Sequence, residues 1–428
     1  MRTPTGPIPN LQDRGAGLAP GRMPRGFHAL IAAQFASALA DNALLIVTIA
    51  LLIERGLPGW WAPLLKFGFT LSYVFLAPFV GPLADAFPKA RLMAWMNGVK
   101  VLGVVALATG VHPVLAFVVV GFGAAAYAPA KYGLITELVR GDQLVVANGW
   151  VEVTVVCAAL LGTVLGGVLV SPWWLATTAP LLQATAGPAT SPLMGSLLAL
   201  LGVYATAAMI NLAVPDSGAR YPKCSLNPAR LTREFAVDNR TLWRDREGGL
   251  SLAVTTIFWG VGATLQFAVL RWAAAVLQLP LDRAAYLQAA VAVGVVAGAS
   301  AAGRWVPLSG ARQMLGAGVL LGVLMAVVAA TRSLAAALPL LVLVGLVGGL
   351  LVVPLNALLQ HRGCTLLSAG RSIAVQGFNE NASVLGMLGA YAAMVALEVP
   401  IDTLMAGFGL CIATAIAALM WRESRRSD

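Results

Sequence analysis

The sequence predicts an all-α membrane protein with 12 transmembrane helices in two six-helix halves and with both termini on the cytoplasmic side. First, the 428 residues are 59% hydrophobic and only 11% charged, whereas soluble domains carry about 25% charged residues. Second, long apolar stretches fall six on each side of one charged segment. Third, the basic residues gather in alternate loops. Two or three soluble domains are excluded, because too little polar surface remains to cover them.

Each predicted span is a mostly apolar stretch of about 20 residues, the length that crosses ~30 Å of hydrocarbon. The N-terminal half covers 27–214, with spans at 27–53, 63–86, 92–111, 113–138, 143–170 and 195–214. The C-terminal half covers 251–421, with spans at 251–278, 285–304, 313–331, 335–359, 372–396 and 403–421. Between the last two spans of the first half, 171–194 is expected to be an outer loop anchored by Trp173 and Trp174.

Three segments are expected to lie in the cytoplasm. Residues 1–26 form a tail that lacks the apolar core and cleavage site of a signal peptide, and 422–428 form a second tail. Residues 215–250 form a linker with seven basic and five acidic residues. Such a charge run is usually a solvated face. An amphipathic helix on the membrane, or a polybasic contact with anionic lipid headgroups, is the alternative.

The distribution of positive charge predicts the orientation. Of the 28 Lys and Arg residues, 21 fall in segments placed in the cytoplasm and four in segments placed outside, as the positive-inside rule requires. The net charge of +10 is therefore explained without nucleic acid. The four cysteines form no C-x-x-C pair, so reduced thiols and no metal site are expected.

One loop motif lies between the second and third spans. Residues 81–91 (GPLADAFPKAR) place Gly81, Asp85, Lys89 and Arg91 in the pattern G-x-x-x-D-x-x-x-[RK]-x-[RK]. This resembles the loop of the major facilitator superfamily, in which the glycine allows close helix packing and the charges form a conformational latch. The alternative is a turn with positive-inside residues. The six-and-six division favours the superfamily and its fold.

Ionisable side chains inside the predicted spans are the functional candidates, because each costs roughly 2.5–3.5 kcal/mol on insertion scales. The charged candidates are Asp41, Lys100, Lys131, Glu152, Arg271 and Glu380. The uncharged ones are Asn42, Gln266, Asn356, Gln376, Asn379 and Asn381. Mutual salt bridges that stabilise the bundle are the alternative for the set, and snorkelling to the surface is the alternative for Arg271. Glu54, Lys66 and Glu137 lie near span ends and are expected to have no functional role.

Asp41 and Glu380 are the strongest of these candidates. Each has an amide beside it in the sequence, and the two belong to opposite halves, so both are expected to face a central cavity and to hold a cation or an ammonium group. The sequence contains no nucleophile elbow and no Walker A motif, so we expect neither an enzyme nor an ATP-driven pump, and no catalytic residues, metal or cofactor.

Longer strings resemble the bacterial lysophospholipid transporter family. They are 34–45 (QFASALADNALL), 123–133 (GAAAYAPAKYG), 353–360 (VPLNALLQ) and 373–381 (IAVQGFNEN). The resemblance implies movement of lysophospholipids, such as lysophosphatidylethanolamine, from the outer to the inner leaflet of a bacterial inner membrane. An acyltransferase–acyl carrier protein synthetase would then restore the second acyl chain. Asp41, Asn42 and Glu380 match polar substrate-path positions of the family.

The chain departs from the family at Gln266, where members carry a basic residue. Arg271 follows five residues later, about 7.5 Å along the helix and rotated by roughly 140°, so it is not assumed to substitute. We expect Lys131, Lys100 or Arg271 to meet the phosphate and Asp41 or Glu380 the amine, while the two halves rock about the site.

Two other function classes stay open at this point. One is a proton-coupled exporter of drugs or small metabolites, and the other is a scaffolding membrane protein. We further expect Na⁺ or H⁺ as the coupling ion, membrane lipids as neighbours, a monomer, and no nucleic-acid partner.

Overall fold

The computed structural model describes residues 23–58, 61–187, 191–221, 227–279 and 281–425, and within these ranges the secondary structure is helical. The first half contains α1 (Arg25–Glu54), α2 (Trp61–Ala86), α3 (Lys89–Ala108), α4 (Pro113–Leu138), α5 (Leu144–Leu169), α6 (Pro172–Ala186) and α7 (Met194–Leu212). After α8 (Pro228–Arg244), the second half contains α9 (Arg246–Val276), α10 (Leu281–Trp305), α11 (Leu315–Ala330), α12 (Leu334–Leu366), α13 (Ala369–Ala396) and α14 (Ile401–Ser424). Short 3₁₀ turns, Gly141–Gln143 and Leu308–Met314, precede α5 and α11.

Eleven of the described helices are long and apolar enough to cross a membrane, and they correspond to eleven of the twelve predicted spans. The predicted span at 372–396 corresponds to α13, which has 28 residues and is therefore also long enough. Its N-terminal half carries Arg371, Gln376, Asn379, Glu380 and Asn381, and these polar side chains lower its hydropathy.

Two segments differ from expectation. The outer loop expected at 171–194 is wrong for most of its length, because Ser171 caps the N-terminus of α6 and Pro172 occupies its first position, where a missing N–H costs nothing. In the linker, Asn227 and Pro228 begin α8 in the same way. The next helix, α9, begins at Arg246, inside the range expected for the linker.

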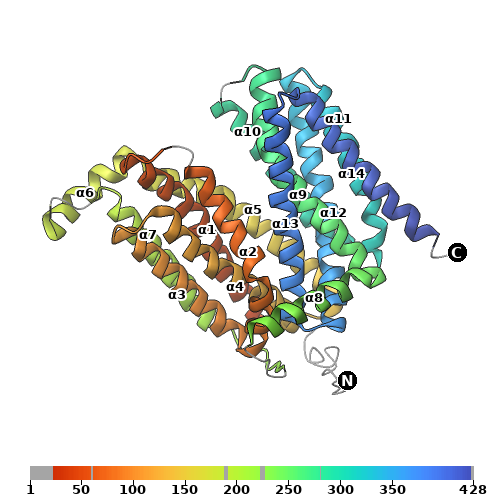
Figure 1. Ribbon diagram of the computed structural model, residues 1–428, viewed down its shortest axis with the longest axis horizontal. Helices are drawn as coiled ribbons and strands as arrows, with labels where there is room; N and C mark the ends of the chain where they lie inside the picture. The colour runs from red at the N-terminus through yellow and green to blue at the C-terminus, as the bar shows by residue number, and fades with distance from the viewer. Residues whose placement is uncertain (1–22, 59–60, 188–190, 222–226, 280, 426–428) are drawn as a thin grey trace.

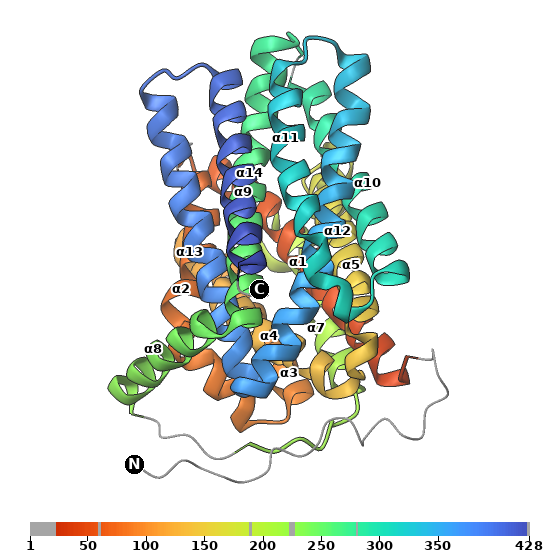
Figure 2. The same cartoon turned by 90° about the vertical axis from the view of Figure 1, so that its right-hand side faces the viewer.

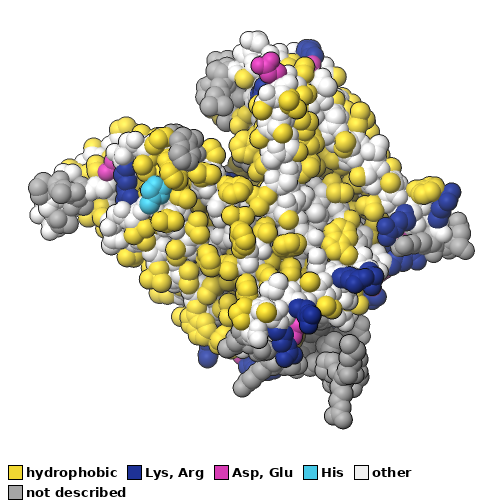
Figure 3. Space-filling view, viewed as in Figure 1, with side chains coloured by type: hydrophobic (Ala, Val, Ile, Leu, Met, Phe, Trp, Pro, Cys, Tyr) yellow, Lys and Arg dark blue, Asp and Glu magenta, His cyan; other side chains and the backbone are white. Residues whose placement is uncertain are grey.

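The two halves lie side by side and meet at one end (Figure 1). There α2 packs against α13, and α5 packs against α10. The linker helix α8 lies across this end, which is at the bottom of Figure 2 and is called the linker end below. Toward the opposite end the halves diverge, and the space-filling view shows the surface hollowed between them (Figure 3).

Small residues let neighbouring helices approach closely within the second half. A Cβ added at Gly298 of α10 would lie 2.0 Å from the carbonyl oxygen of Leu346, and one added at Gly345 of α12 would lie 2.0 Å from that of Val291. Only glycine fits at such distances. The spacing of Gly294 and Gly298 in α10, and of Gly345 and Gly349 in α12, predicts this close approach. The α10–α12 pair is therefore a tight unit of the second half.

Candidate functional site

A buried ion pair lies inside the first half. The Nζ atom of Lys100 on α3 is 2.7 Å from Oδ2 of Asp41 on α1, and it also donates to the hydroxyl of Ser37 at 2.9 Å. The second carboxylate oxygen of Asp41 accepts from the hydroxyl of Tyr204 on α7 at 2.7 Å. This pair is therefore one of the mutual salt bridges that the alternative interpretation of the charged residues predicts.

Lys100 is held on its remaining sides by aromatic rings. Its side chain is 2% exposed, and its Nζ lies 5.2 Å from the ring centre of Tyr127 and 5.7 Å from that of Tyr204. A buried ammonium needs such compensation, because removal from water costs several kcal/mol. The Asp41–Lys100 pair is thus saturated within the first half.

Lys131 on α4 is held much more loosely. Its Nζ donates to the side-chain oxygen of Gln34 at 3.2 Å and lies 4.0 Å from the ring centre of Tyr132. Gln34 is itself oriented by a 2.6 Å hydrogen bond to the hydroxyl of Thr154 on α5. Glu152 on α5 is buried and lies within electrostatic range. Within the described residues Lys131 forms no ion pair within 4.0 Å, and of its three ammonium donors only one has a hydrogen-bond acceptor.

The second half contributes one carboxylate, Glu380, which is hydrogen-bonded within a group of amides. The side-chain nitrogen of Gln376 on α13 donates to Asn356 on α12 at 3.0 Å and to Glu380 at 2.8 Å. Glu380 lies within electrostatic range of Glu152 in the first half, and both carboxylates also act on Tyr132. Among the described residues Glu380 has no basic partner within 4.0 Å. Glu152 of α5 thus lies within electrostatic range of both Lys131 on α4 and Glu380 on α13.

Other predicted site residues do not join this cluster. The amides of Asn42 and Asn381 donate to backbone oxygens of their own helices, those of Ala38 and Gly377. Gln266 and Arg271 on α9 are exposed, and within the described residues neither forms a hydrogen bond or ion pair with the cluster through its side chain. The helix α9, which corresponds to the seventh predicted span, therefore brings neither Gln266 nor Arg271 into this cluster.

The loop motif forms an ion cluster at the linker end. The Nζ of Lys89 lies 2.6 Å from Glu137 on α4 and 3.6 Å from Asp85. Glu137 also accepts from the hydroxyls of Ser217 and Tyr221, at 2.5 and 2.8 Å, so its contacts at this span end are structural. Arg91 is exposed and makes no ion pair with described residues.

The same motif bridges the two halves. Asp85 accepts hydrogen bonds from the hydroxyl of Ser368 and, at 3.0 Å, from the backbone N–H of Gly370, at the beginning of α13. A Cβ at Gly81 would lie 2.9 Å from the Cα of Arg371, so the motif glycine permits this approach. Close packing at Gly81 and contact through Asp85 join the halves here.

The linker helix α8 is fixed to the first turns of α13. Arg371 of α13 lies 2.6 Å from Glu234 and 3.3 Å from Asp238. Asn379, which lies within a predicted span, donates to Asn239 at 2.9 Å and accepts from the indole N–H of Trp243 at 3.0 Å. Burial raises the pKa of Asp238 to about 6, an effect that Arg371 opposes and Glu234 reinforces.

Several residues of these networks were missed from the sequence. Gln34, Tyr127, Tyr132 and Tyr204 complete the environments of the two lysines. In the sequence, each of these residues is an uncharged polar side chain within a predicted span. Such a side chain indicates a functional site less strongly than a charged one does. Among the described residues no group of three His, Cys, Asp or Glu side chains is arranged to hold a metal ion.

Comparison with known proteins agrees with this architecture. The family model described as Major Facilitator Superfamily matches residues 29–390. "Lysophospholipid transporter LplT" of Citrobacter koseri is 42% identical over 404 residues, which cover 94% of this chain and 96% of the relative. The protein of the same name from Escherichia coli K12 is also 42% identical, with the same coverage.

Solved structures show the same fold at low sequence identity. The transporter FucP in its outward conformation aligns with a TM-score of 0.69 at 14% identity, over 92% of this chain and 98% of that one. A bacterial homologue of the iron transporter ferroportin in an outward-facing state also gives 0.69, at 15% identity, over 94% and 100%.

Proposed function

The chain belongs to the major facilitator superfamily and, within it, to the bacterial lysophospholipid transporter family, and from this membership we propose that it moves lysophospholipids from the outer to the inner leaflet of a bacterial inner membrane. Lysophosphatidylethanolamine is the substrate that we would test first. We propose that the protein is a secondary transporter and that it has no catalytic residues.

The observation that carries the proposal is Lys131 with its unused ammonium donors. Glu152 of the same half lies within electrostatic range of it, and Glu380 of the second half lies within electrostatic range of Glu152. A lysophosphatidylethanolamine headgroup joins an anionic phosphate to a cationic amine. Lys131 retains ammonium donors for the phosphate, and Glu380, which lacks a basic partner among the described residues, suits the amine. Asp41 is a weaker candidate for the amine, because Lys100 and Tyr204 already occupy its carboxylate.

The single acyl chain explains why a path between two halves suffices. Only the polar headgroup needs a route shielded from hydrocarbon, while the chain stays in lipid or against an apolar helix surface. The halves separate at the end opposite α8 (Figure 1). Access from the linker end would require the Asp85–Gly370 contact to break as the halves rock about the site.

Membrane topology completes the proposal. We place α13 across the membrane as the twelfth span, with Arg371 and Asn379 turned toward α8 and the backbone N–H of Gly370 bound to Asp85 of the first half. Both termini and α8 then lie in the cytoplasm, in agreement with the distribution of basic residues. We further propose a monomer, with Na⁺ or H⁺ as the coupling ion. An acyltransferase–acyl carrier protein synthetase on the cytoplasmic side would consume the product.

The test is inward movement of a fluorescent lysophosphatidylethanolamine in liposomes that contain the purified protein. Movement above that of protein-free liposomes is expected, and imposed Na⁺ and H⁺ gradients identify the coupling ion. Lys131→Gln should slow movement at least tenfold, since a charge-assisted hydrogen bond contributes about 1.5–3 kcal/mol.

Arg271→Gln is the matched control, because it also removes one positive charge from a predicted span, at an exposed position outside the cluster. It should leave the rate within about twofold, as is usual for a surface substitution away from such networks. Equal losses in both variants would contradict a specific role of Lys131. No movement by folded protein under any gradient would overturn the lysolipid proposal and favour the exporter.

A further inference from the structure

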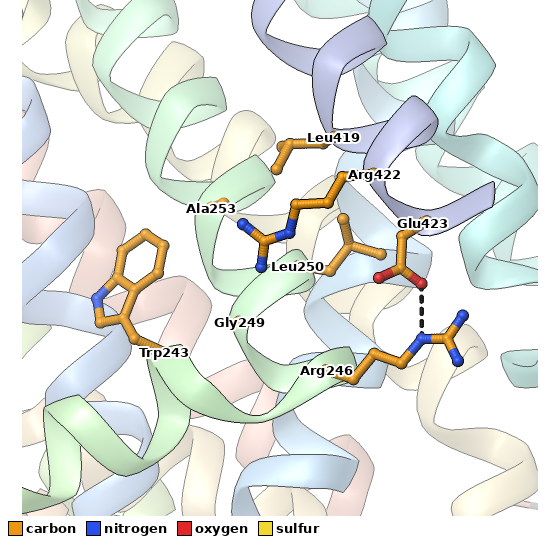
Figure 4. A pocket seen from close by; sticks show the side chains of 8 residues that line it. All are labelled: Trp243, Arg246, Gly249, Leu250, Ala253, Leu419, Arg422 and Glu423. Atoms are coloured by element: carbon orange, nitrogen blue, oxygen red, sulfur yellow. Dashed lines mark hydrogen bonds and ion pairs between the residues drawn. The ribbon is translucent and has the colours of Figure 1, made fainter. Parts of the chain in front are cut away.

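A pocket lies outside the central cluster, at the linker end, where α8, α9 and α14 meet (Figure 4). It holds about 400 Å³ of space, part of it open to solvent. Its lining consists of Trp243, Arg246, Gly249, Leu250, Ala253, Leu419, Arg422 and Glu423. None of these residues belongs to the candidate transport site or to the Asp85 contact between the halves.

The pocket carries an excess of positive charge. Its one carboxylate, Glu423, lies 2.9 Å from Arg246 and 3.8 Å from Arg312, so two arginines already neutralise it. Arg422 has no hydrogen-bond or ion-pair partner among the described residues. Its guanidinium lies over the first turns of α9, within the pocket (Figure 4). An anion entering the pocket would therefore meet a guanidinium whose donors are unused.

Apolar side chains lie directly beside this charge. Leu250 of α9 and Leu419 of α14 line the pocket, and Trp243 forms its wall on the α8 side. The pocket sits at the last turns of α14 and the first turns of α9, both of which are candidate membrane spans. A free phosphate ion would use only the arginine, whereas an amphiphile would use both surfaces.

We propose that this pocket binds an anionic phospholipid of the surrounding membrane, with the headgroup phosphate on Arg422 and an acyl chain along Leu419 and Leu250. Basic pockets between helix ends on the cytoplasmic side suit anionic headgroups, and a guanidinium pairs with phosphate through two parallel hydrogen bonds. This lipid is a resident ligand and is distinct from the transported lysolipid.

Binding there would join the linker to the second half. Trp243 also donates to Asn379 of α13, and Arg246 begins α9, so a lipid in this pocket contacts the junction of α8, α9 and α14 next to α13. A ligand that binds the folded state stabilises it by mass action. Anionic lipid should therefore raise the thermal stability of the purified protein, and neutral lipid should not.

The test uses purified full-length protein in neutral detergent, titrated with phosphatidylglycerol or phosphatidylcholine. Native mass spectrometry counts the retained lipids, and tryptophan fluorescence gives the melting temperature. Wild type should retain phosphatidylglycerol in preference to phosphatidylcholine. Arg422→Gln should weaken that retention about tenfold, the typical effect of one lost charge-assisted bond, and Arg422→Lys should weaken it less.

Arg425→Gln is the matched control. Arg425 is an exposed arginine three residues away that stacks on Trp421 and does not line the pocket. It should bind phosphatidylglycerol as wild type does. Equal losses in the two glutamine variants would overturn the proposal in favour of diffuse attraction to the basic surface. Competition by millimolar inorganic phosphate without any effect of lipid would also overturn it, because the pocket would then be a simple anion site.

Discussion

Asn148 of α5 and Gln360 of α12 exchange two hydrogen bonds of 2.9 Å across the two halves of the molecule. Each side-chain nitrogen donates to the oxygen of the other amide, and the two residues are 3% and 0% exposed. The pair lies near the linker end, where the Asp85 contact also joins the halves. A reciprocal amide pair loses both bonds when the halves separate, so it favours the conformation described here.

Breaking one side of this pair should cost more than removing both sides. Asn148→Leu leaves the Gln360 amide buried without a partner, which costs about 1–3 kcal/mol. Gln360→Met has the reciprocal effect, whereas the double variant leaves no unsatisfied amide. We therefore expect both single variants to lower the melting temperature and the double variant to recover most of the loss. A strictly additive loss would contradict the direct pairing.

Cys364 provides a native reporter for opening at the linker end. Its thiol is buried and contacts the hydroxyl of Thr136 in the first half at 3.4 Å. Asp85→Ala removes the acceptor for Ser368 and Gly370, and so should increase the fraction of molecules open at this end. We expect Cys364 to react with a maleimide at least about tenfold faster in this variant, a ratio that corresponds to roughly 1.4 kcal/mol.

The exposed Cys411 of α14 serves as the internal control in that experiment. Its labelling rate, followed by peptide mass spectrometry in the same sample, should not change in Asp85→Ala. Faster labelling of both cysteines would indicate general unfolding, and unchanged labelling of Cys364 would show that Asp85 does not hold this end closed.

Asp41→Asn should impair folding as well as transport. The substitution leaves the ammonium of Lys100 buried without its carboxylate, and breaking a buried pair in this way costs about 3–5 kcal/mol. Asp41→Asn combined with Lys100→Met should recover folded protein, as judged by size-exclusion chromatography and melting temperature. A single variant as stable as wild type would show that Lys100 finds another partner or loses its proton.

Much of the fold followed from the sequence, because apolar length and charge position directly reflect the cost of burying polar groups in lipid. Eleven predicted spans correspond to candidate membrane helices. The interval at 171–194 failed because Pro172, Pro180 and several threonines suggested a loop, although Ser171 and Pro172 begin a helix. The polar residues of α13 lowered its hydropathy because they serve contacts with α8 and the central cluster.

The candidate site was predictable residue by residue but not as a set of pairs. A charge within a predicted span is conspicuous in a sequence, so Asp41, Lys100, Lys131 and Glu380 were found individually. Their pairing depends on helix rotation, which the weak periodicity of helices that are apolar all round does not fix. Lys100 and Arg271 both lie within predicted spans. The rotation of their helices nevertheless buries Lys100 beside Asp41 and leaves Arg271 exposed.

The contact between α8 and α13 should depend on pH through Asp238. Burial raises the pKa of this carboxyl from 3.8 to about 6 despite Arg371 beside it, so the folded protein favours the protonated form. The stabilisation that follows from this raised pKa is therefore fully present below about pH 4, and it is lost as the pH rises through 6. Glu234 acts in the opposite sense, because its hydrogen bonds with Arg230 and Arg371 lower its pKa.

Comparison of wild type with Asp238→Asn separates these two effects. The variant keeps a neutral side chain of the same shape, so its stability should lack the decrease that Asp238 causes between about pH 4 and 6. The difference in melting temperature between variant and wild type should then grow in favour of the variant from pH 5 to pH 7. A constant difference over this range would show that Asp238 remains ionised, with Arg371 outweighing the effect of burial.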